Sequence, residues 1–458
     1  MKREMSIYVH IPFCVRKCNY CDFLSFCADK DLVERYFEAL KEEVRVACER
    51  IYREVHSEIC SDATSADVRR GRQSADALNI NDTPLVRSIF FGGGTPSFVD
   101  AKLICDVLET ISSSFDLAKD AEISIEVNPA SAMLDKLQAY KNAGFNRISI
   151  GAQSLNDSEL KMLGRVHDCA MFYETFENAR KAGFTNINVD VMSALPNQSI
   201  DSYVTTLKKV IDLKPEHISA YSLIVEEGTP FYEMDLALPD ENTDRAMYHE
   251  TKRILEKAGY HRYEISNYAL EGYECRHNKV YWRRGNYLGL GLGAASMIDN
   301  LRWSNIRDIG EYIDALCSTS SLEIHDGSFA MDNQCVEDSC LAKIRTDTEK
   351  LSEKSQMEEF MFLGLRLVEG VSTNEFRQQF GCDLEEVYAD VIRKYNEMGL
   401  LEYAKRSGMS DSSADGCDSY LQTDGGNKLS PITTDMYLRL TEKGLDVSNT
   451  VMADFLLD

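Results

Sequence analysis

The chain has 458 residues, 44% of them hydrophobic and 27% charged, which excludes a largely disordered protein and allows about three domains, or one large domain with a small one. Its 75 Asp and Glu outnumber its 50 Lys and Arg, and the formal net charge of −25 disfavours a nucleic-acid partner. The sequence has neither a bilayer-spanning apolar stretch nor a signal-peptide-like region near Met1, so we expect a cytoplasmic protein with no integral membrane segment.

Short β-rich runs alternate with helical patterns over the first half of the chain. Strands are expected at Ser6–Ile11, Arg87–Phe91, Glu122–Val127, Arg147–Gly151, Asn186–Met192 and His217–Leu223. Helices are expected at Val33–Ile51, Leu103–Ile111, Leu134–Ala143, Phe172–Ala182 and Tyr203–Leu213. Gly144 and Gly183 stand where a helix should end before the next strand. The alternation predicts parallel strands in an open or closed α/β barrel, although a doubly wound sheet would give the same pattern.

The end of the chain has a different pattern. Helices are expected at Glu359–Val368, after the capping box Ser372–Glu375, at Leu384–Met398 and at Thr441–Leu457, and short strands at Leu400–Tyr403 and Met436–Leu440. This order predicts a small separate domain with a two-strand wing. Three Ser/Asp-rich segments are expected to be mobile inserted loops without a role in chemistry: His56–Pro84, Ser318–Lys350 and Arg406–Thr433.

Three cysteines lie close together on the loop after the first expected strand. Cys14, Cys18 and Cys21 have the spacing C-x3-C-x2-C, and thiolates are soft ligands that suit zinc, copper(I) or an iron–sulfur cluster. A closed zinc site needs four ligands, and no obvious C-x2-C pair follows downstream. A four-iron cubane held by three cysteines leaves one iron open to an outside ligand. Both alternatives stay open from the spacing alone.

The triad follows Tyr8-Val-His10-Ile-Pro-Phe, and the whole segment resembles the signature of radical S-adenosylmethionine (SAM) proteins. Within them the chain is most similar to the oxygen-independent coproporphyrinogen III oxidase superfamily and its heme chaperone branch, HemW. The resemblance runs from Tyr8 to about Ser304 and resumes from Glu359. It implies a partial (β/α)6 radical SAM barrel with a small α+β, winged-helix-like C-terminal domain. It also implies a [4Fe-4S] cluster on Cys14, Cys18 and Cys21 that binds SAM through its fourth iron.

The same resemblance assigns the SAM contacts. The turn Phe91–Pro96 contains three glycines, which let the backbone approach a ligand closely and point N–H groups at it. Polar residues at the ends of later strands would converge on one mouth of a barrel, although each could instead be a salt-bridged structural group. The implied SAM-binding residues are Tyr8, Tyr20, Gly93, Gly94, Thr95, Glu126, Gln153, Arg165, Asp190 and Ile224.

Two features separate the chaperone branch from the oxidases. Phe23 stands where the oxidases carry a fourth cysteine, and the chain begins only five residues before its first expected strand. His277–Trp282 resembles the HNxxYW motif of the chaperones, which makes His277 a candidate heme ligand. The alternative is a hydrogen-bonded or surface histidine among arginines. Gly289–Gly293 is expected to close the SAM pocket.

The expected organisation follows from these motifs. Residues 1–230 would form the radical SAM barrel, 231–317 would complete it and carry the HNxxYW motif, 318–350 would be an inserted loop, and 351–458 a C-terminal domain interrupted by 406–433. The implied function is a chaperone that binds heme, or another tetrapyrrole, and passes it to an acceptor protein. A coproporphyrinogen III oxidase and a structural zinc protein are the alternatives, and dimerisation stays open.

Overall fold

The computed structural model describes residues 2–61, 83–317, 340–405 and 436–457, which divide into two compact units. The barrel unit contains the chain up to Arg262, Ser266–Tyr281 and Gly285–Lys350. The C-terminal unit contains Tyr263–Ile265, Trp282–Arg284 and the chain from Leu351 onward. Among the helices in these ranges, none combines the length and the apolar character that crossing a membrane requires.

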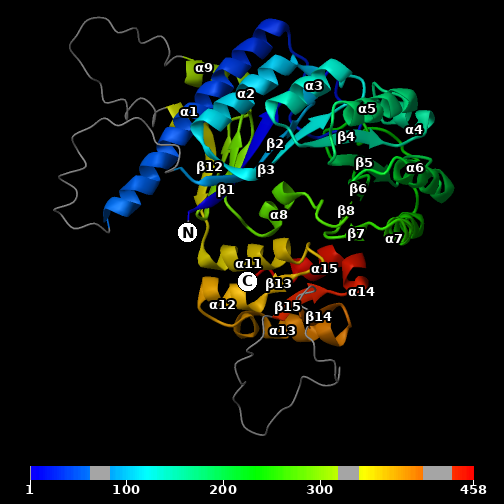
Figure 1. The fold of residues 1–458 in the computed structure, drawn as a ribbon. Coiled ribbons are helices and arrows are strands. Elements are labelled where there is room, and N and C mark those ends of the chain that lie inside the picture. Colours follow the sequence, from blue (N-terminus) through cyan, green and yellow to red (C-terminus); the bar gives the residue numbers. More distant parts are fainter. Residues whose placement is uncertain (1, 62–82, 318–339, 406–435, 458) are drawn as a thin grey trace, which may run out of the picture. The chain divides into compact units, whose positions relative to one another are not determined.

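Six parallel strands form the centre of the barrel unit and neighbour one another in chain order (Figure 1). They are β1 (Glu4–Ile11), β2 (Leu85–Gly93), β3 (Asp116–Val127), β4 (Arg147–Gln153), β5 (Ile187–Ser193) and β6 (His217–Ser222). A doubly wound sheet would reverse its strand order at a switch point. The sequential order therefore confirms the barrel alternative of the predicted α/β fold.

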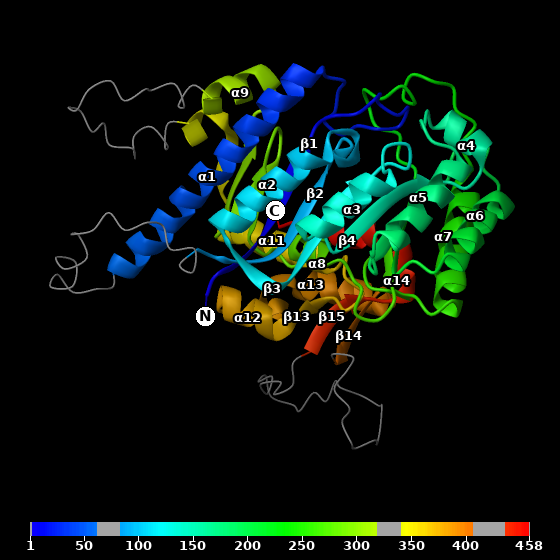
Figure 2. The ribbon, with the colours of Figure 1, turned by 45° about the horizontal axis from the view of Figure 1, so that its top comes forward.

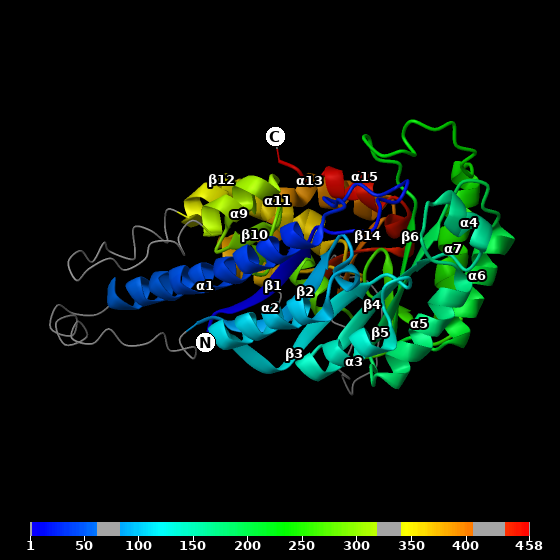
Figure 3. The same cartoon turned by 90° about the horizontal axis from the view of Figure 1, so that it is seen from above.

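Helices connect the strands and pack on one another along the outside of the sheet (Figures 2 and 3). They are α1 (Lys30–Ser61), α2 (Ala101–Ser114), α3 (Leu134–Ala143), α4 (Asp157–Met162), α5 (Cys169–Lys181) and α6 (Ile200–Asp212), with a 3-10 turn η3 (Pro96–Phe98). Apolar residues of both layers form one buried core, in which strand residues such as Ile7 and Ile89 join helix residues such as Leu40 and Ile104. Gly144 ends α3 with a φ of +113°, as the sequence predicts.

Further elements extend both edges of this sheet, giving the order β12-β11-β10-β9-β1 on one side and β6-β8-β7 on the other. Their bounds are β7 (His261–Arg262), β8 (Asn267–Ala269), β9 (Tyr287–Leu290), β10 (Ala295–Ile298), β11 (Leu301–Asn305), β12 (Arg345–Lys350), α7 (Glu241–Lys257), α8 (Arg276–Trp282) and α9 (Ile309–Cys317). Strand β9 pairs with β1 in parallel, whereas β10, β11 and β12 follow as antiparallel partners.

Two of the expected loops are shorter than predicted. Helix α1 continues through His56 to Ser61, and β12 occupies Arg345–Lys350, where its backbone pairs with β11. A strand of mostly exposed polar residues such as Arg345–Lys350 has no apolar periodicity, so only its edge pairing reveals it. Residues 340–344 of the second expected loop form a helical turn, whereas 62–82, 318–339 and all of Arg406–Thr433 lie outside the described residues.

The C-terminal unit packs helices on a three-stranded antiparallel sheet of order β13-β15-β14. Its elements are α11 (Glu353–Gly364), β13 (Val371–Ser372), α12 (Thr373–Phe380), α13 (Leu384–Glu397), β14 (Leu401–Lys405), β15 (Met436–Leu440), α14 (Glu442–Asp446) and α15 (Ser448–Ala453). Ser372 caps α12 by accepting from the N–H of Glu375, which confirms the predicted start of this helix. The single helix expected over Thr441–Leu457 is wrong, because Val447 leaves the helical region with φ −124° and ψ 27°.

Candidate functional site

The cysteine loop between β1 and α1 lines a cavity of about 370 Å³ at the carboxyl ends of the strands. Main-chain hydrogen bonds fix the course of this loop. The N–H of Cys14 donates to the Phe26 carbonyl at 3.1 Å, and the N–H of Asn19 donates to the Leu163 carbonyl at 3.0 Å. The three cysteine side chains are partly exposed and line the cavity. The backbone thus holds the loop while its thiols remain accessible.

The thiols make only weak contacts with neighbouring polar groups. The Cys14 Sγ lies 3.2 Å from the Thr95 hydroxyl, and Arg165 Nη1 donates to the Cys18 Sγ at 3.6 Å. Burial raises the pKa of Cys14 and of Cys21. Among the described residues, no three His, Cys, Asp or Glu side chains are close enough together to hold one metal ion. A cubane places each thiolate on a different iron, and all three thiols line the same cavity.

The glycine turn after β2 lies directly beneath the cysteine loop. Gly93 has a φ of +111°, and a Cβ there would lie 2.6 Å from the ring of His10. The prediction that the glycine N–H groups of this turn point at a ligand is wrong for Gly94, whose N–H donates to the Ile11 carbonyl at 2.8 Å. The N–H of Thr95 donates to the Phe13 carbonyl at 2.9 Å. Two N–H groups of the turn therefore hold the cysteine loop in place, since the carbonyls of the loop need hydrogen-bond donors.

Polar side chains from successive strands face the same cavity. In the strand register, Glu126 is opposite Ser149 on β4, while Asp190 is opposite Gly151 on β4 and Ser219 on β6. Burial, and next the charge of Asp190, raise the pKa of Glu126 to about 8. Burial also raises the pKa of Asp190, although Asn188 and Ser149 donate to its carboxylate at 2.7 and 3.2 Å. Two partly buried carboxyl groups thus share one cavity wall, an arrangement suited to a cationic ligand.

Most of the residues predicted from sequence come together in this cavity, which we call the outer cavity. It is lined by Cys14, Cys18, Cys21, Tyr20, Gly93, Gly94, Thr95, Glu126, Gln153, Arg165 and Asp190. Sequence reasoning missed Tyr221, which also lines it and donates its hydroxyl to Gln153 Oε1 at 3.1 Å. Period-two alternation along β6 from Ser219 would have identified Tyr221 as facing the same side. It also passed over Cys27, an exposed cysteine whose thiol donates to the Val15 carbonyl.

Two predicted SAM contacts lie elsewhere. Tyr8 lines a second cavity of about 210 Å³, and its hydroxyl lies 3.2 Å from His10 Nδ1. This inner cavity shares Glu126, Ser149, Asp190, Ser219 and Asn278 with the outer cavity, so the two are adjacent. Ile224 lines neither of these two cavities, and its side chain is 69% exposed.

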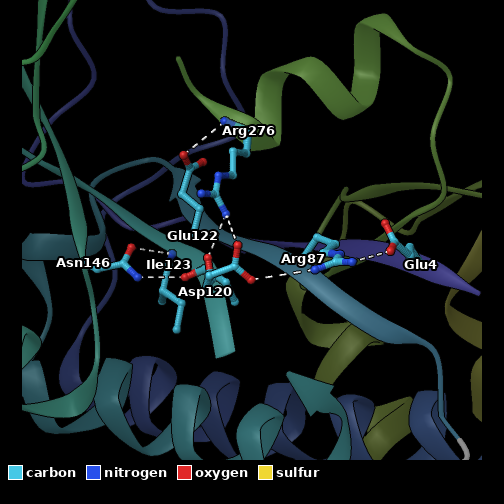
Figure 4. A network of polar contacts seen from close by, with 8 residues as sticks. Glu4, Arg87, Asp120, Glu122, Ile123, Asn146 and Arg276 are labelled. Carbon is cyan, nitrogen blue, oxygen red and sulfur yellow. Dashed lines mark hydrogen bonds and ion pairs between the residues drawn. The ribbon is translucent and has the colours of Figure 1, made fainter. Parts of the chain in front are cut away.

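His277 lines the inner cavity from α8 and is only 1% exposed. Its two ring nitrogens lie 2.9 Å from the hydroxyls of Ser88 and Tyr281. The first turn of α8 is held by β3, since the Glu122 carboxylate accepts from the N–H of Arg276 at 3.0 Å (Figure 4). It also accepts from the N–H of His277 at 3.1 Å. The imidazole is therefore a satisfied interior group in this conformation.

The glycine run at 289–293 does not close the outer cavity, contrary to the prediction. Gly291 donates its N–H to the Glu43 carboxylate of α1 at 2.7 Å, and a Cβ on Gly289 would lie 2.1 Å from the Ala295 carbonyl. Asn305 and Tyr312 also donate to Glu43. The small residues thus leave room for β9, β10 and α1 to pack closely. The donors around Glu43 are needed because a buried carboxylate without hydrogen bonds is costly.

Comparison with known proteins agrees with this geometry. The radical SAM superfamily matches residues 8–210, and the HemN C-terminal domain matches residues 351–407. The heme chaperone HemW of Lactococcus lactis subsp. lactis (strain IL1403) is 30% identical over 462 residues, which cover 100% of this chain and 99% of that protein. The heme chaperone HemW of Bacillus subtilis (strain 168) is 31% identical over 401 residues, which cover 86% of this chain and 92% of that protein.

A solved structure shares the fold. Coproporphyrinogen III oxidase (HemN) from Escherichia coli, a radical SAM enzyme, superimposes with a TM-score of 0.69 at 22% identity, covering 99% of this chain and 90% of that chain. Radical SAM proteins carry a [4Fe-4S] cluster and SAM, which is the chemistry that the cysteine loop and the outer cavity fit. With a relative matched at 30% identity along its whole length, the chain belongs to the HemW family of the radical SAM superfamily.

Proposed function

We propose that this protein binds heme and transfers it to an acceptor protein, and that it holds a SAM-binding [4Fe-4S] cluster. The observation that carries the proposal is the match to heme chaperones over the full length of the chain. Phe23 supports it from the site. It lines the outer cavity, is 70% exposed, and stands where the related oxidases carry a further cysteine.

The outer cavity provides the groups that the cofactors require. Cys14, Cys18 and Cys21 would hold the cluster, which supplies an electron for reductive cleavage of SAM. Glu126 and Asp190 line this cavity and would bind the cationic part of SAM, and Arg165 lies beside the Cys18 thiol. Tyr20, Gln153 and the turn Gly93–Thr95 would complete the SAM site, whereas Tyr8 would act from the inner cavity and Ile224 from outside both.

The full-length match to heme chaperones and the presence of Phe23 at the outer cavity favour the chaperone over the oxidase alternative. The fold shared with HemN does not by itself carry its reaction over to this chain, because one fold hosts many activities.

The location and the partners extend the proposal. We infer a reducing, cytoplasmic location, in keeping with the eleven cysteines among the described residues that form no disulfide. The acceptor would be a protein that binds heme more tightly than this chain does, since transfer must run downhill.

Heme titration of the anaerobically reconstituted full chain tests the proposal. We expect a Soret band that saturates on titration, a changed band in His277→Ala, and movement of the heme to added apomyoglobin. The absence of heme binding by the wild-type chain would refute the proposal. Formation of protoporphyrinogen IX and 5′-deoxyadenosine from coproporphyrinogen III and SAM would establish the oxidase instead.

A further inference from the structure

A row of buried polar side chains crosses the three adjacent parallel strands β4, β5 and β6 (Figure 1). In the strand register, Asn188 on β5 is opposite Ser149 on β4 and His217 on β6. The exposed fractions of Ser149, Asn188 and His217 are 5%, 2% and 0%. Asp190 follows Asn188 by two residues on β5, so both side chains face the same side of the sheet. Asn188 lines the inner cavity and Asp190 lines both cavities, whereas His217 lines neither of them.

The hydrogen bonds of Asn188 join this row to Asp190. Its Nδ2 donates to Asp190 Oδ1 at 2.7 Å and to the Ser149 hydroxyl at 2.7 Å. Its Oδ1 accepts from the Ser219 hydroxyl at 3.1 Å and lies 2.6 Å from His217 Nδ1. The Ser149 hydroxyl in turn donates to Asp190 Oδ2 at 3.2 Å. Asn188 therefore holds one carboxylate oxygen of Asp190 directly and the other through Ser149.

The carboxylate determines the direction of the other bonds. An ionised carboxylate only accepts hydrogen bonds, so the Asn188 amide must turn Nδ2 toward Asp190 and Oδ1 toward His217. Burial lowers the pKa of His217 well below its usual value, and a neutral imidazole carries a single hydrogen. That hydrogen must be on Nδ1, because Nδ1 faces an oxygen that only accepts. The imidazole thus opposes rotation of the amide from the side away from Asp190.

We propose that Asn188 and His217 are positioning residues that hold the Asp190 carboxylate in the orientation in which it binds SAM. The inference rests on the proposed SAM site, to which Asp190 contributes from the wall that the two cavities share. A carboxylate that is already held in place loses no rotational freedom when its ligand binds, which strengthens binding. His217 lines neither cavity, so it acts on SAM only through Asn188.

SAM binding by the anaerobically reconstituted full chain, measured by equilibrium dialysis of radiolabelled SAM, tests this role. Asn188→Leu removes a hydrogen bond to a charged group and should weaken SAM binding by about tenfold or more. His217→Leu leaves the amide free to turn and should weaken it by about threefold to tenfold. His217→Asn puts an amide nitrogen in the place of Nδ1 and should restore most of the affinity.

Tyr203→Phe is the matched control. It removes a buried hydrogen bond of 2.7 Å to Thr251, and Tyr203 lines neither cavity, so SAM binding should stay unchanged. A double-mutant cycle separates positioning from a general loss of stability. In an Asp190→Asn background, His217→Leu should weaken SAM binding no further, because the carboxylate that it positions has been removed. An equal loss in both backgrounds would overturn the proposal.

A second measurement needs no cofactor and keeps the two proposals apart. In 15N-histidine-labelled, iron-free protein, the resonances that vanish in His217→Asn should report an Nδ1–H tautomer, and Asn188→Leu should shift them. An Nε2–H tautomer, or SAM binding by His217→Leu equal to that of Tyr203→Phe, would overturn the positioning role and leave the SAM site intact. A wild-type chain that assembles its cluster but binds no SAM would instead refute the proposed SAM site, and the role of both residues with it.

Discussion

The cysteine loop and α8 both contain a short motif that stands out in the sequence, but the structure uses them differently. Main-chain hydrogen bonds hold the cysteine loop in place, and its three partly exposed thiols line a cavity. Helix α8 presents His277 to the interior with both ring nitrogens hydrogen-bonded. A buried polar side chain needs hydrogen-bond partners within the protein, whereas the exposed side chains of a ligand-binding loop do not. A motif therefore reveals which chemistry is present, and only the packing reveals whether it is accessible.

The largest effect, loss of the cluster, is expected at the accessible cysteine loop. Cys18→Ala removes one of three thiols around the outer cavity, and a cubane that loses one of only three protein ligands should not assemble. We expect anaerobically reconstituted protein to lose its iron, its sulfide and its broad visible absorption. Cys27→Ala is the control, because this exposed thiol donates to the Val15 carbonyl and does not line the cavity. Full iron content in Cys18→Ala would mean that the Cys18 thiol is not a cluster ligand. The proposed difference between an accessible cysteine loop and a buried α8 would then no longer hold.

A pH-dependent effect of a few kcal/mol is expected at Glu126, which both cavities share. Burial and Asp190 raise its pKa from 4.5 to about 8, so between these pH values the folded chain keeps a proton that the unfolded chain releases. The free energy of unfolding should therefore fall as the pH rises through this window, by up to about 1.4 kcal/mol per pH unit, and level off above it. Urea unfolding of iron-free protein at pH 5, 6.5 and 8 measures this slope.

Glu126→Gln isolates the contribution of this carboxyl group to the pH dependence of the free energy of unfolding. The amide does not titrate, so the variant should have a shallower slope than wild type and should be the more stable of the two at pH 8. Some slope should persist, because burial raises the pKa of Asp190 as well. Parallel curves for the two proteins would mean that Glu126 is already ionised in the fold.

The sequence predicts the strands and the inward polar residues well because these signals are local. Alternation within a strand and its position in the chain are enough to bring Glu126, Gln153 and Asp190 to one cavity once the strands are parallel. The role of Gly291 was not predictable in this way. Its partner Glu43 is 248 residues away in the sequence, and no local pattern reports such a contact.

The burial of His277 was hidden for a related reason. Arg276, Lys279 and Arg283 make the motif look like an exposed basic turn, and local charge usually means solvent. The structure resolves the conflict by periodicity, since His277 and Tyr281 are four residues apart and share the inward face of α8. Glu122, on β3, supplies the acceptors that allow this turn to be buried.

The smallest of these effects is expected where β3 holds α8, and it tests the buried region directly. Glu122→Ala leaves the buried N–H of His277 without its acceptor, which should cost about 1 to 3 kcal/mol and lower the urea midpoint of iron-free protein. Asp120→Asn is the control: it meets the exposed guanidinium of Arg276 on the same turn (Figure 4), and an exposed ion pair contributes far less. Equal midpoints for the two variants would mean that α8 is held by its surface charges.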